Sequence, residues 1–234
     1  MISDESRRAL SWAVKRITAV IFDMDGVLID SEPQHFESTN LCLEPEGAYL
    51  DEDAALAYLG WNERAFWGAL KERFGLTKDV EHYIAERSQI VVELLRRDLP
   101  VAEGALELLE ELHSRGVSLA VASSSERDLI EYVLEESGFA RFFQEIASGC
   151  EVTRSKPDPE IFLLAATRLQ VDPSECLVFE DAPHGVKGAL AAGMSCIRVV
   201  TRATEGMEFP ELNGAIECFA ELDLDRILNQ RSAS

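Results

Sequence analysis

The chain has 234 residues, of which 47 % are hydrophobic and 28 % are charged, a composition typical of a globular protein rather than of a disordered segment or a fibre. Its 43 Asp and Glu residues outnumber its 22 Lys and Arg residues, which gives a formal net charge of −21. A surface this acidic repels nucleic-acid phosphates and anionic lipids. We therefore expect neither a nucleic acid nor a membrane as partner, and expect any phosphorylated ligand to be small.

The sequence shows no pattern for export or for membrane insertion. Its longest apolar runs, residues 54–59 and 161–166, are far shorter than the roughly 20 residues of a membrane-spanning helix. Residues 1–16 mix acidic with basic side chains and lack the apolar stretch of a secretory signal. The cysteines are widely spaced, form no C-x-x-C pair and are odd in number, which is typical of reduced thiols. We expect a cytoplasmic protein.

Short apolar runs alternate with amphipathic stretches along most of the chain. Continuous apolar runs predict strands buried on both faces at residues 17–22, 117–122, 176–179 and 195–200, with a weaker candidate at residues 144–147. Helical periodicity follows them from Ala105 to just before Gly116 and at residues 128–137, 158–169 and 182–192. Strands that alternate with helices predict an α/β fold with a parallel sheet.

This alternation stops between about residues 33 and 99. That interval has helical periodicity at residues 65–74 and 80–97 and no convincing strand. We expect an all-helical domain, residues 33–99, inserted between the first and second strands. The α/β core then consists of residues 1–32 and 100–234.

Two acidic pairs follow predicted strands. Asp23 and Asp25 come directly after the first strand, and Glu180 and Asp181 come after the strand at residues 176–179. Both pairs should lie at the carboxyl edge of the sheet, where open α/β sheets bind ligands. Two anionic clusters at one edge repel each other and require a counter-charge. Carboxylate and carbonyl oxygens suit Mg²⁺ better than zinc, and the four histidines lack metal-ligand spacing.

Groups that can hold an oxyanion are expected at the same edge. Ser123, Ser124 and Ser125 follow the second strand and offer hydroxyl and backbone N–H groups at the start of a helix. Lys156 precedes a helix whose first turn is defined by prolines, so its ammonium should lie near the sheet edge. Its positive charge would complement a bound phosphoryl group.

These segments together resemble the four motifs of the haloacid dehalogenase superfamily. The resemblance covers about residues 17–200 and rests on DMDGVLIDSE, the serine after the second strand, SKPDP and FEDAPHGVKGALAAGM. The pattern is most similar to the β-phosphoglucomutase-like and sugar-phosphatase branch. The resemblance implies a Rossmann-like parallel-sheet core with an inserted helical cap. Dehalogenase members lack the second acid of the first motif, so the presence of Asp25 favours phosphoryl transfer.

The resemblance also implies a role for each matching residue. Asp23 would be the nucleophile that forms an aspartyl-phosphate, and Asp25 would be the general acid and base. Ser123 and Lys156 would hold the phosphate, with Ser124 as the next candidate for the serine.

Metal ligands are implied by the same motifs. Mg²⁺ would be bound by the Asp23 carboxylate, the Asp25 carbonyl and Asp181. Glu180 would be a nearby or outer-shell ligand.

We interpret residues 59–64 as a Gly-centred turn between cap helices, just before the helix predicted at residues 65–74. Cap loops of related enzymes select substrates, so the resemblance makes Gly60, Trp61 and Arg64 candidate substrate contacts. The other aromatic residues of the insertion, such as Trp67, are expected in its core.

The function we expect is a monomeric, Mg²⁺-dependent phosphatase that acts on a small phosphorylated metabolite, a sugar phosphate. A phosphosugar mutase is the alternative. Family mutases hold a second phosphate with an Arg in the cap turn and a Lys-Asn pair after the serines. Those places here read roughly Glu63 and Glu126-Arg127. An acidic residue facing a phosphate is unfavourable, although Arg64 or Arg127 can substitute.

Two further functions remain open at this stage. A phospho-receiver signalling module also places an Asp cluster, a Ser or Thr and a Lys at the edge of a parallel sheet, but such modules are about half as long and lack a helical cap. A catalytically silent binder with the same fold is the third possibility, which the four intact motifs disfavour.

Overall fold

The computed structural model describes residues 16–58, 63–204 and 206–228. The chain divides into two compact units. One holds the described residues up to Ile29 and from Val101 onward, and the other is Asp30–Pro100.

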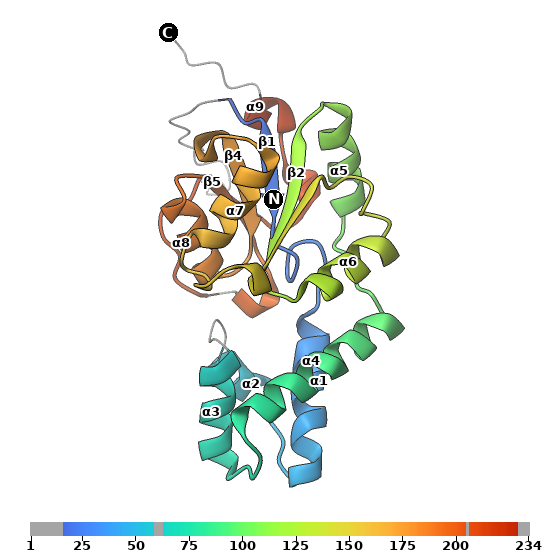
Figure 1. The fold of residues 1–234 in the computed structure, drawn as a ribbon, viewed down its shortest axis with the longest axis vertical. Coiled ribbons are helices and arrows are strands. Elements are labelled where there is room, and N and C mark those ends of the chain that lie inside the picture. Colours follow the sequence, from blue (N-terminus) through green and yellow to red (C-terminus); the bar gives the residue numbers. More distant parts are fainter. Residues whose placement is uncertain (1–15, 59–62, 205, 229–234) are drawn as a thin grey trace, which may run out of the picture. The chain divides into compact units, whose positions relative to one another are not determined.

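A six-stranded parallel sheet with the strand order β3-β2-β1-β4-β5-β6 forms the centre of the larger unit (Figure 1). The strands are β1 (Ala19–Phe22), β2 (Ser118–Ser123), β3 (Glu145–Ser148), β4 (Cys176–Glu180), β5 (Ser195–Val199) and β6 (Gly214–Ile216). The five predicted strands are confirmed with ends shifted by one or two residues. The sixth, β6, was not predicted, because three residues are too short to show a pattern.

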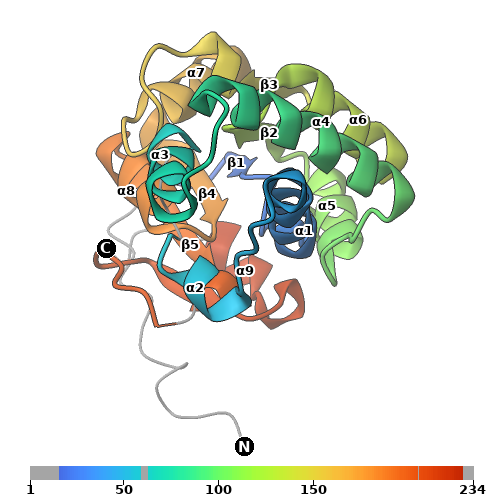
Figure 2. The ribbon, with the colours of Figure 1, turned by 90° about the horizontal axis from the view of Figure 1, so that it is seen from below.

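Helices cover both faces of this sheet (Figures 1 and 2). They are α5 (Ala105–Ser114), α6 (Arg127–Glu136), α7 (Glu160–Leu169), α8 (Pro183–Ala191) and α9 (Leu224–Leu228). Ile161 and Phe162 of α7 and Val186 of α8 pack with alternate strand residues such as Ile21 and Val178. Phe22 points to the other face, where its ring stacks on Phe179 at 5.1 Å and meets Phe219 edge-on. Burial on both faces explains why the strands are continuous apolar runs.

Strand pairing brings the ends of three strands to one level. Phe22, the last residue of β1, pairs with Val121 of β2 on one side and with Phe179 of β4 on the other. Asp23, Ala122 and Glu180 therefore follow at adjacent positions along the carboxyl edge.

In the described part of the smaller unit, the regular elements are all helices. It consists of α1 (Glu32–Leu43), α2 (Glu52–Leu56), α3 (Glu63–Phe74) and α4 (Val80–Arg97). It has its own apolar core, in which the buried Trp67 ring stacks on Tyr83 with centroids 5.0 Å apart. The expectation that Trp67 belongs to the core is confirmed.

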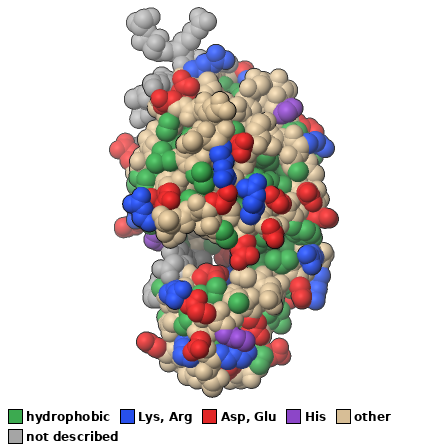
Figure 3. All heavy atoms as spheres, in the orientation of Figure 1, with side chains coloured by type: hydrophobic (Ala, Val, Ile, Leu, Met, Phe, Trp, Pro, Cys, Tyr) green, Lys and Arg blue, Asp and Glu red, His purple; other side chains and the backbone are tan. Residues whose placement is uncertain are grey.

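Two further features of the described residues are the character of the helices and the distribution of surface charge. None of the helices in the described ranges combines the length and apolar character that crossing a membrane requires. Figure 3 shows acidic and basic side chains interspersed over one face of the larger unit.

Candidate active site

Asp23 begins the site at the end of the central strand β1. Its backbone N–H still donates to the Phe179 carbonyl oxygen at 2.9 Å, so its main chain is held by the sheet. The residue is only 7 % exposed. A buried carboxylate is costly unless it is paired.

Lys156 supplies the pairing. Its Nζ lies 2.7 Å from Asp23 Oδ1 and 2.7 Å from Glu180 Oε1, and it donates to the Ala122 carbonyl oxygen at 3.1 Å. Asp23 directly follows β1, and the other two partners lie in β4 and β2, so one ammonium links the ends of three neighbouring strands. The structure therefore places Lys156 at the sheet edge where its position before a helix predicted it.

Three carboxylates lie together at this edge of the sheet. Asp23, Glu180 and Asp181 each offer an oxygen, and these oxygens lie within 4.8 Å of one another. An all-oxygen donor set of this kind fits Mg²⁺, a hard cation, rather than a metal that prefers nitrogen or sulfur ligands.

Glu180 and Asp181 differ in how they are held. Both Glu180 oxygens are engaged, since Oε1 accepts from Lys156 and Oε2 accepts from the Ala182 N–H at 2.8 Å. Asp181 Oδ2 accepts from the Thr201 hydroxyl at 3.4 Å. Glu180 is thus held through both of its oxygens, whereas Asp181 accepts a longer hydrogen bond through Oδ2.

Two glycines make room for these carboxylates. A Cβ on Gly26, which has a φ of +75°, would lie 2.3 Å from Asp181 Oδ2. A Cβ on Gly185 in α8 would lie 1.6 Å from Glu180 Oε1. The carboxylates therefore occupy space that only glycine leaves open.

The electrostatics show an excess of negative charge at this edge. Burial raises the pKa of Asp23 to about 7, with Glu180 and Asp25 adding to the rise and Lys156 opposing it. Burial, Glu180 and Asp23 raise the pKa of Asp181 well above its ordinary value. Burial alone would lower the pKa of Lys156, but the Asp23 and Glu180 carboxylates raise it. A divalent cation would relieve this repulsion.

Asp25 lies beside the serines that follow β2. Ser125 Oγ donates to Asp25 Oδ2 at 3.1 Å, and the Ser125 N–H donates to Ser123 Oγ at 3.1 Å. Ser123 is 1 % exposed, whereas Ser124 is exposed to solvent. The structure thus brings Asp25 and the serine segment together.

Sequence reasoning missed two contacts in this region. Ser125 was predicted only as part of an oxyanion cradle, and its contact with Asp25 depends on the course of the loop. Thr201, which contacts Asp181, was not predicted at all. Its position just after β5 was the available signal, because the other site residues also follow strand ends.

The structure describes one of the three candidate substrate contacts in the turn at residues 59–64. Gly60 and Trp61 lie outside the described residues. Arg64 is in α3 and forms an ion pair with Glu81 at 2.6 Å within the helical unit.

Comparison with protein families agrees with these motifs. The model of the haloacid dehalogenase-like hydrolases matches residues 17–193. This range includes the first three candidate motifs and all of the fourth except its last residue, Met194.

Alignments with similar proteins cover most of the length of this chain. A phosphorylated carbohydrates phosphatase of Thermotoga maritima is 36 % identical over 184 residues, which is 76 % of this chain and 83 % of that protein. A fructose-1-phosphate phosphatase of Escherichia coli is 31 % identical over 188 residues, 79 % of this chain and 97 % of that protein. The structure of CbbY from Rhodobacter sphaeroides in complex with xylulose-1,5-bisphosphate superimposes with a TM-score of 0.79 at 25 % identity, covering 88 % of this chain and 96 % of CbbY.

Proposed function

Because this chain belongs to the haloacid dehalogenase-like hydrolase family as one of its phosphatases, we propose that it hydrolyses a small sugar phosphate through an aspartyl-phosphate on Asp23, with Mg²⁺ as cofactor. The observation that carries the proposal is the position of Lys156 Nζ, 2.7 Å from both Asp23 and Glu180, beside a cluster of three carboxylates. A cation and an oxygen-rich cluster around one buried carboxylate are what phosphoryl transfer to that carboxylate requires.

In the first step, an Asp23 carboxylate oxygen attacks the phosphorus of the substrate. The bond between phosphorus and the sugar oxygen breaks, and its electron pair stays on that oxygen. The protonated Asp25 carboxyl gives its proton to the leaving oxygen. Lys156 and the Ser123 hydroxyl offset the negative charge on the transferring phosphoryl group.

In the second step, water attacks the phosphorus of the aspartyl-phosphate. The Asp25 carboxylate takes a proton from this water, and the bond between phosphorus and Asp23 breaks. Inorganic phosphate leaves and both carboxyl groups return to their starting states.

Mg²⁺ would be held by the Asp23 and Asp181 carboxylates and the Asp25 carbonyl, where it supplies positive charge for the phosphoryl oxygens. Glu180 would act from the outer shell, because both of its oxygens already accept hydrogen bonds. The pKa values of Asp23 and Asp181 are raised first by burial and then by neighbouring carboxylates. They support a cation here, since a cation would stabilise the charged form of both groups.

The relatives support a phosphorylated carbohydrate as substrate. Two of them are named for phosphatase activity on phosphorylated carbohydrates or on fructose 1-phosphate, and the CbbY structure holds a sugar bisphosphate. We assign this substrate class to the present chain and expect the helical unit, including Gly60, Trp61 and Arg64, to select among its members.

Hydrolysis is favoured over a mutase reaction by the contacts of two arginines. Arg127 binds Glu131 at 2.8 Å and Glu151 at 3.4 Å, and Arg64 binds Glu81. Each would have to leave an acidic partner to hold a second phosphate.

A phosphate-release assay over phosphorylated sugars, nucleoside 5′-phosphates and short phosphorylated acids tests the proposal. We expect Mg²⁺-dependent release from sugar phosphates, abolished by EDTA and lowered at least about 10³-fold by Asp23→Asn. Asp53→Asn, which changes an exposed carboxylate of α2, is the matched control and should leave the rate unchanged.

Two results would contradict the proposal. The first is a rate that neither EDTA nor Asp23→Asn lowers. The second is conversion of β-glucose 1-phosphate, in the presence of a bisphosphate activator, to the 6-phosphate without net phosphate release, which would assign a mutase instead.

A further inference from the structure

A network of hydrogen bonds and ion pairs extends from Asp25 to the turn that follows β3 and to helices α6 and α7. Its first link is the Ser125 hydroxyl, which donates to Asp25 Oδ2 at 3.1 Å. Neither the charge pattern nor the motifs account for the residues beyond this link.

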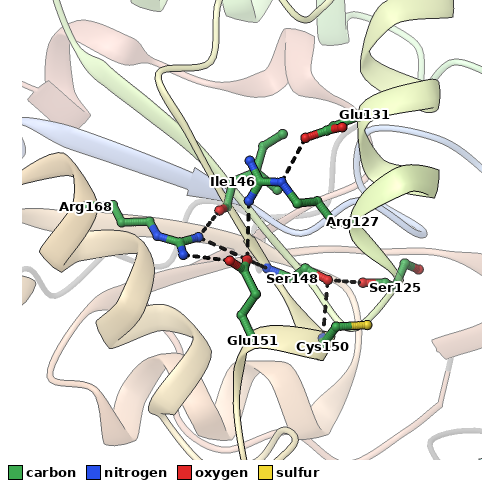
Figure 4. Close-up of polar contacts among 8 residues, drawn as sticks. All are labelled: Ser125, Arg127, Glu131, Ile146, Ser148, Cys150, Glu151 and Arg168. Atoms are coloured by element: carbon green, nitrogen blue, oxygen red, sulfur yellow. Dashed lines mark hydrogen bonds and ion pairs between the residues drawn. The ribbon is translucent and has the colours of Figure 1, made fainter.

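Ser148, the last residue of β3, forms the second link. Its hydroxyl donates to the Ser125 carbonyl oxygen at 2.7 Å (Figure 4). Ser148 is fully buried and pairs with Ser123 in the sheet register. The hydroxyl therefore joins the end of β3, an edge strand of the sheet, to the loop that carries Ser125.

Glu151 forms the third link, from the short helical turn that follows β3. Its Oε2 accepts from the Ser148 N–H at 3.0 Å, which completes a capping box with Ser148. Arg168 of α7 binds both carboxylate oxygens, at 2.7 and 3.0 Å, and Arg127 of α6 approaches Oε2 at 3.4 Å (Figure 4). Arg168 also donates to the Ile146 carbonyl oxygen.

These contacts hold Glu151 firmly as a carboxylate. The Arg168 hydrogen bonds lower its pKa to about 2, with the Ser148 N–H and the charge of Arg127 adding to the effect. A bidentate arginine gives a carboxylate a fixed orientation as well as binding energy. The capping box is thereby tied to α6 and α7 at once.

A close backbone approach at the same place gives independent evidence. A Cβ on Gly149 would lie 2.3 Å from the Ser124 carbonyl oxygen. The turn after β3 and the loop after β2 are therefore in tight contact, so a shift of one displaces the other.

A capping box by itself only ends a strand and starts a turn. This one differs because the Ser148 hydroxyl, which accepts from the Cys150 N–H within the turn, also donates to the carbonyl oxygen of Ser125, the residue that contacts Asp25. The route from Glu151 to Asp25 passes through Ser148 and Ser125, with every hydrogen bond of the route between 2.7 and 3.1 Å.

We propose that Ser148 and Glu151 are positioning residues for catalysis, which fix the Ser125 loop so that its hydroxyl holds the Asp25 carboxyl for proton transfer. This inference rests on the proposed function. Asp25 gives a proton to the leaving oxygen as the bond between phosphorus and that oxygen breaks, so its position matters most when the leaving oxygen is a strong base.

The choice of leaving group provides the test. A sugar alkoxide needs the proton, whereas p-nitrophenolate leaves without one. The ratio kcat/KM covers the steps up to transfer of the phosphoryl group to Asp23. We expect Ser148→Ala and Glu151→Gln to lower kcat/KM for a sugar phosphate about 10-fold, through kcat, and for p-nitrophenyl phosphate by less than about 3-fold.

Matched controls separate positioning from a general loss of structure. Ser137→Ala removes a part-buried hydroxyl that bonds a carbonyl at the end of α6, and Glu110→Gln removes a carboxylate paired with Arg141 on the surface. Both variants should leave kcat/KM unchanged for the sugar phosphate and for p-nitrophenyl phosphate. Ser125→Ala should reproduce the selective loss and Ser125→Thr, which keeps the hydroxyl, should restore most of it. These variants test the proposal even if Ser148→Ala does not fold.

The outcomes are distinct. Loss confined to the sugar phosphate supports the inference. An equal loss with both substrates, or none with either, overturns it and leaves the proposed function intact. Absence of phosphate release by the unaltered chain from both substrates would reject the proposed function and this inference with it.

Discussion

Lys156 is a buried ammonium that is stabilised by two neighbouring carboxylates. Its ammonium donates to Asp23 and Glu180, and its side chain is 9 % exposed. The free-energy cost of desolvating the lysine is offset by its contacts with two carboxylates. Removing the lysine leaves those carboxylates buried without their partner.

Lys156→Ala should therefore destabilise the protein as well as inactivate it. We expect a loss of about 3–5 kcal/mol in the free energy of unfolding, measured by urea denaturation in EDTA. Mg²⁺ should reduce this loss, because it supplies charge to the same carboxylates. Lys187→Ala, at an exposed position of α8, should change stability by less than about 0.5 kcal/mol. Equal effects of the two variants would refute the role of Lys156.

The raised pKa of Asp23 makes the stability of the metal-free protein depend on pH. Its pKa is raised from 3.8 to about 7, so in the metal-free protein Asp23 takes up a proton on folding between these values. This group therefore lowers the stability of the metal-free protein as pH rises from 3.8 to about 7, and the loss is complete above that.

Metal binding should show the opposite dependence on pH. Because Mg²⁺ needs the deprotonated carboxylate, the contribution of Asp23 to its affinity should rise up to about tenfold per pH unit below pH 7 and level off above it. Calorimetric titration with Mg²⁺ at several pH values measures this. An affinity that does not change between pH 6 and 8 would contradict the assignment of Asp23 as a ligand.

At the scale of elements, the sequence predicted those parts whose pattern is local. Apolar runs predicted β1 to β5, and their order of occurrence with helices predicted a parallel sheet. Helix α1 was not predicted, because it has no apolar stripe. Its buried face includes Ser38 and Thr39, whose hydroxyls bond to the His35 carbonyl oxygen within the helix.

The candidate site was predictable to the extent that it follows strand ends. Asp23, Glu180 and Asp181 could be placed at one edge from the parallel sheet alone. The link between Lys156 and Asp23 joins residues 133 positions apart, and only the folded chain shows which carboxylates the ammonium contacts. The bond from Ser148 to Ser125 likewise depends on the pairing of β2 with β3.

Gly185, one of the two glycines of α8, tests how closely this helix packs against the site. Alanine normally stabilises a helix relative to glycine by up to about 1 kcal/mol. Gly185→Ala should instead destabilise the protein by about 1–3 kcal/mol and lower Mg²⁺-dependent turnover, because its Cβ would overlap Glu180 Oε1. Gly68→Ala in α3, where a Cβ meets nothing within 4 Å, should be neutral or stabilising in the same unfolding assay. A stabilised, fully active Gly185→Ala variant would contradict the geometry.

At the scale of the whole molecule, two units with separate cores share one chain. The helical unit leaves and rejoins the larger unit at adjacent points, since the Asp30 N–H donates to the Pro100 carbonyl oxygen at 2.8 Å and Ile29 bridges to Val101. A short linker can therefore replace it without separating strands of the sheet.

Replacing residues 31–99 with Gly-Gly should leave the larger unit folded, as judged by circular dichroism, and able to bind Mg²⁺ by calorimetry. It should lose discrimination among sugar phosphates, because we assign that selection to the helical unit. If the shortened chain keeps the full selectivity of the intact one, the assignment is wrong.

The measurement that tests the account most directly is trapping of the phosphorylated protein. The chain is mixed with Mg²⁺ and a substrate carrying labelled phosphate, quenched in acid within one turnover, digested and analysed by mass spectrometry. We expect label on Asp23, released by hydroxylamine as is typical of an acyl phosphate, and absent with EDTA or in Asp23→Asn. Label on another residue, or full turnover with no labelled protein at any time, would contradict this prediction.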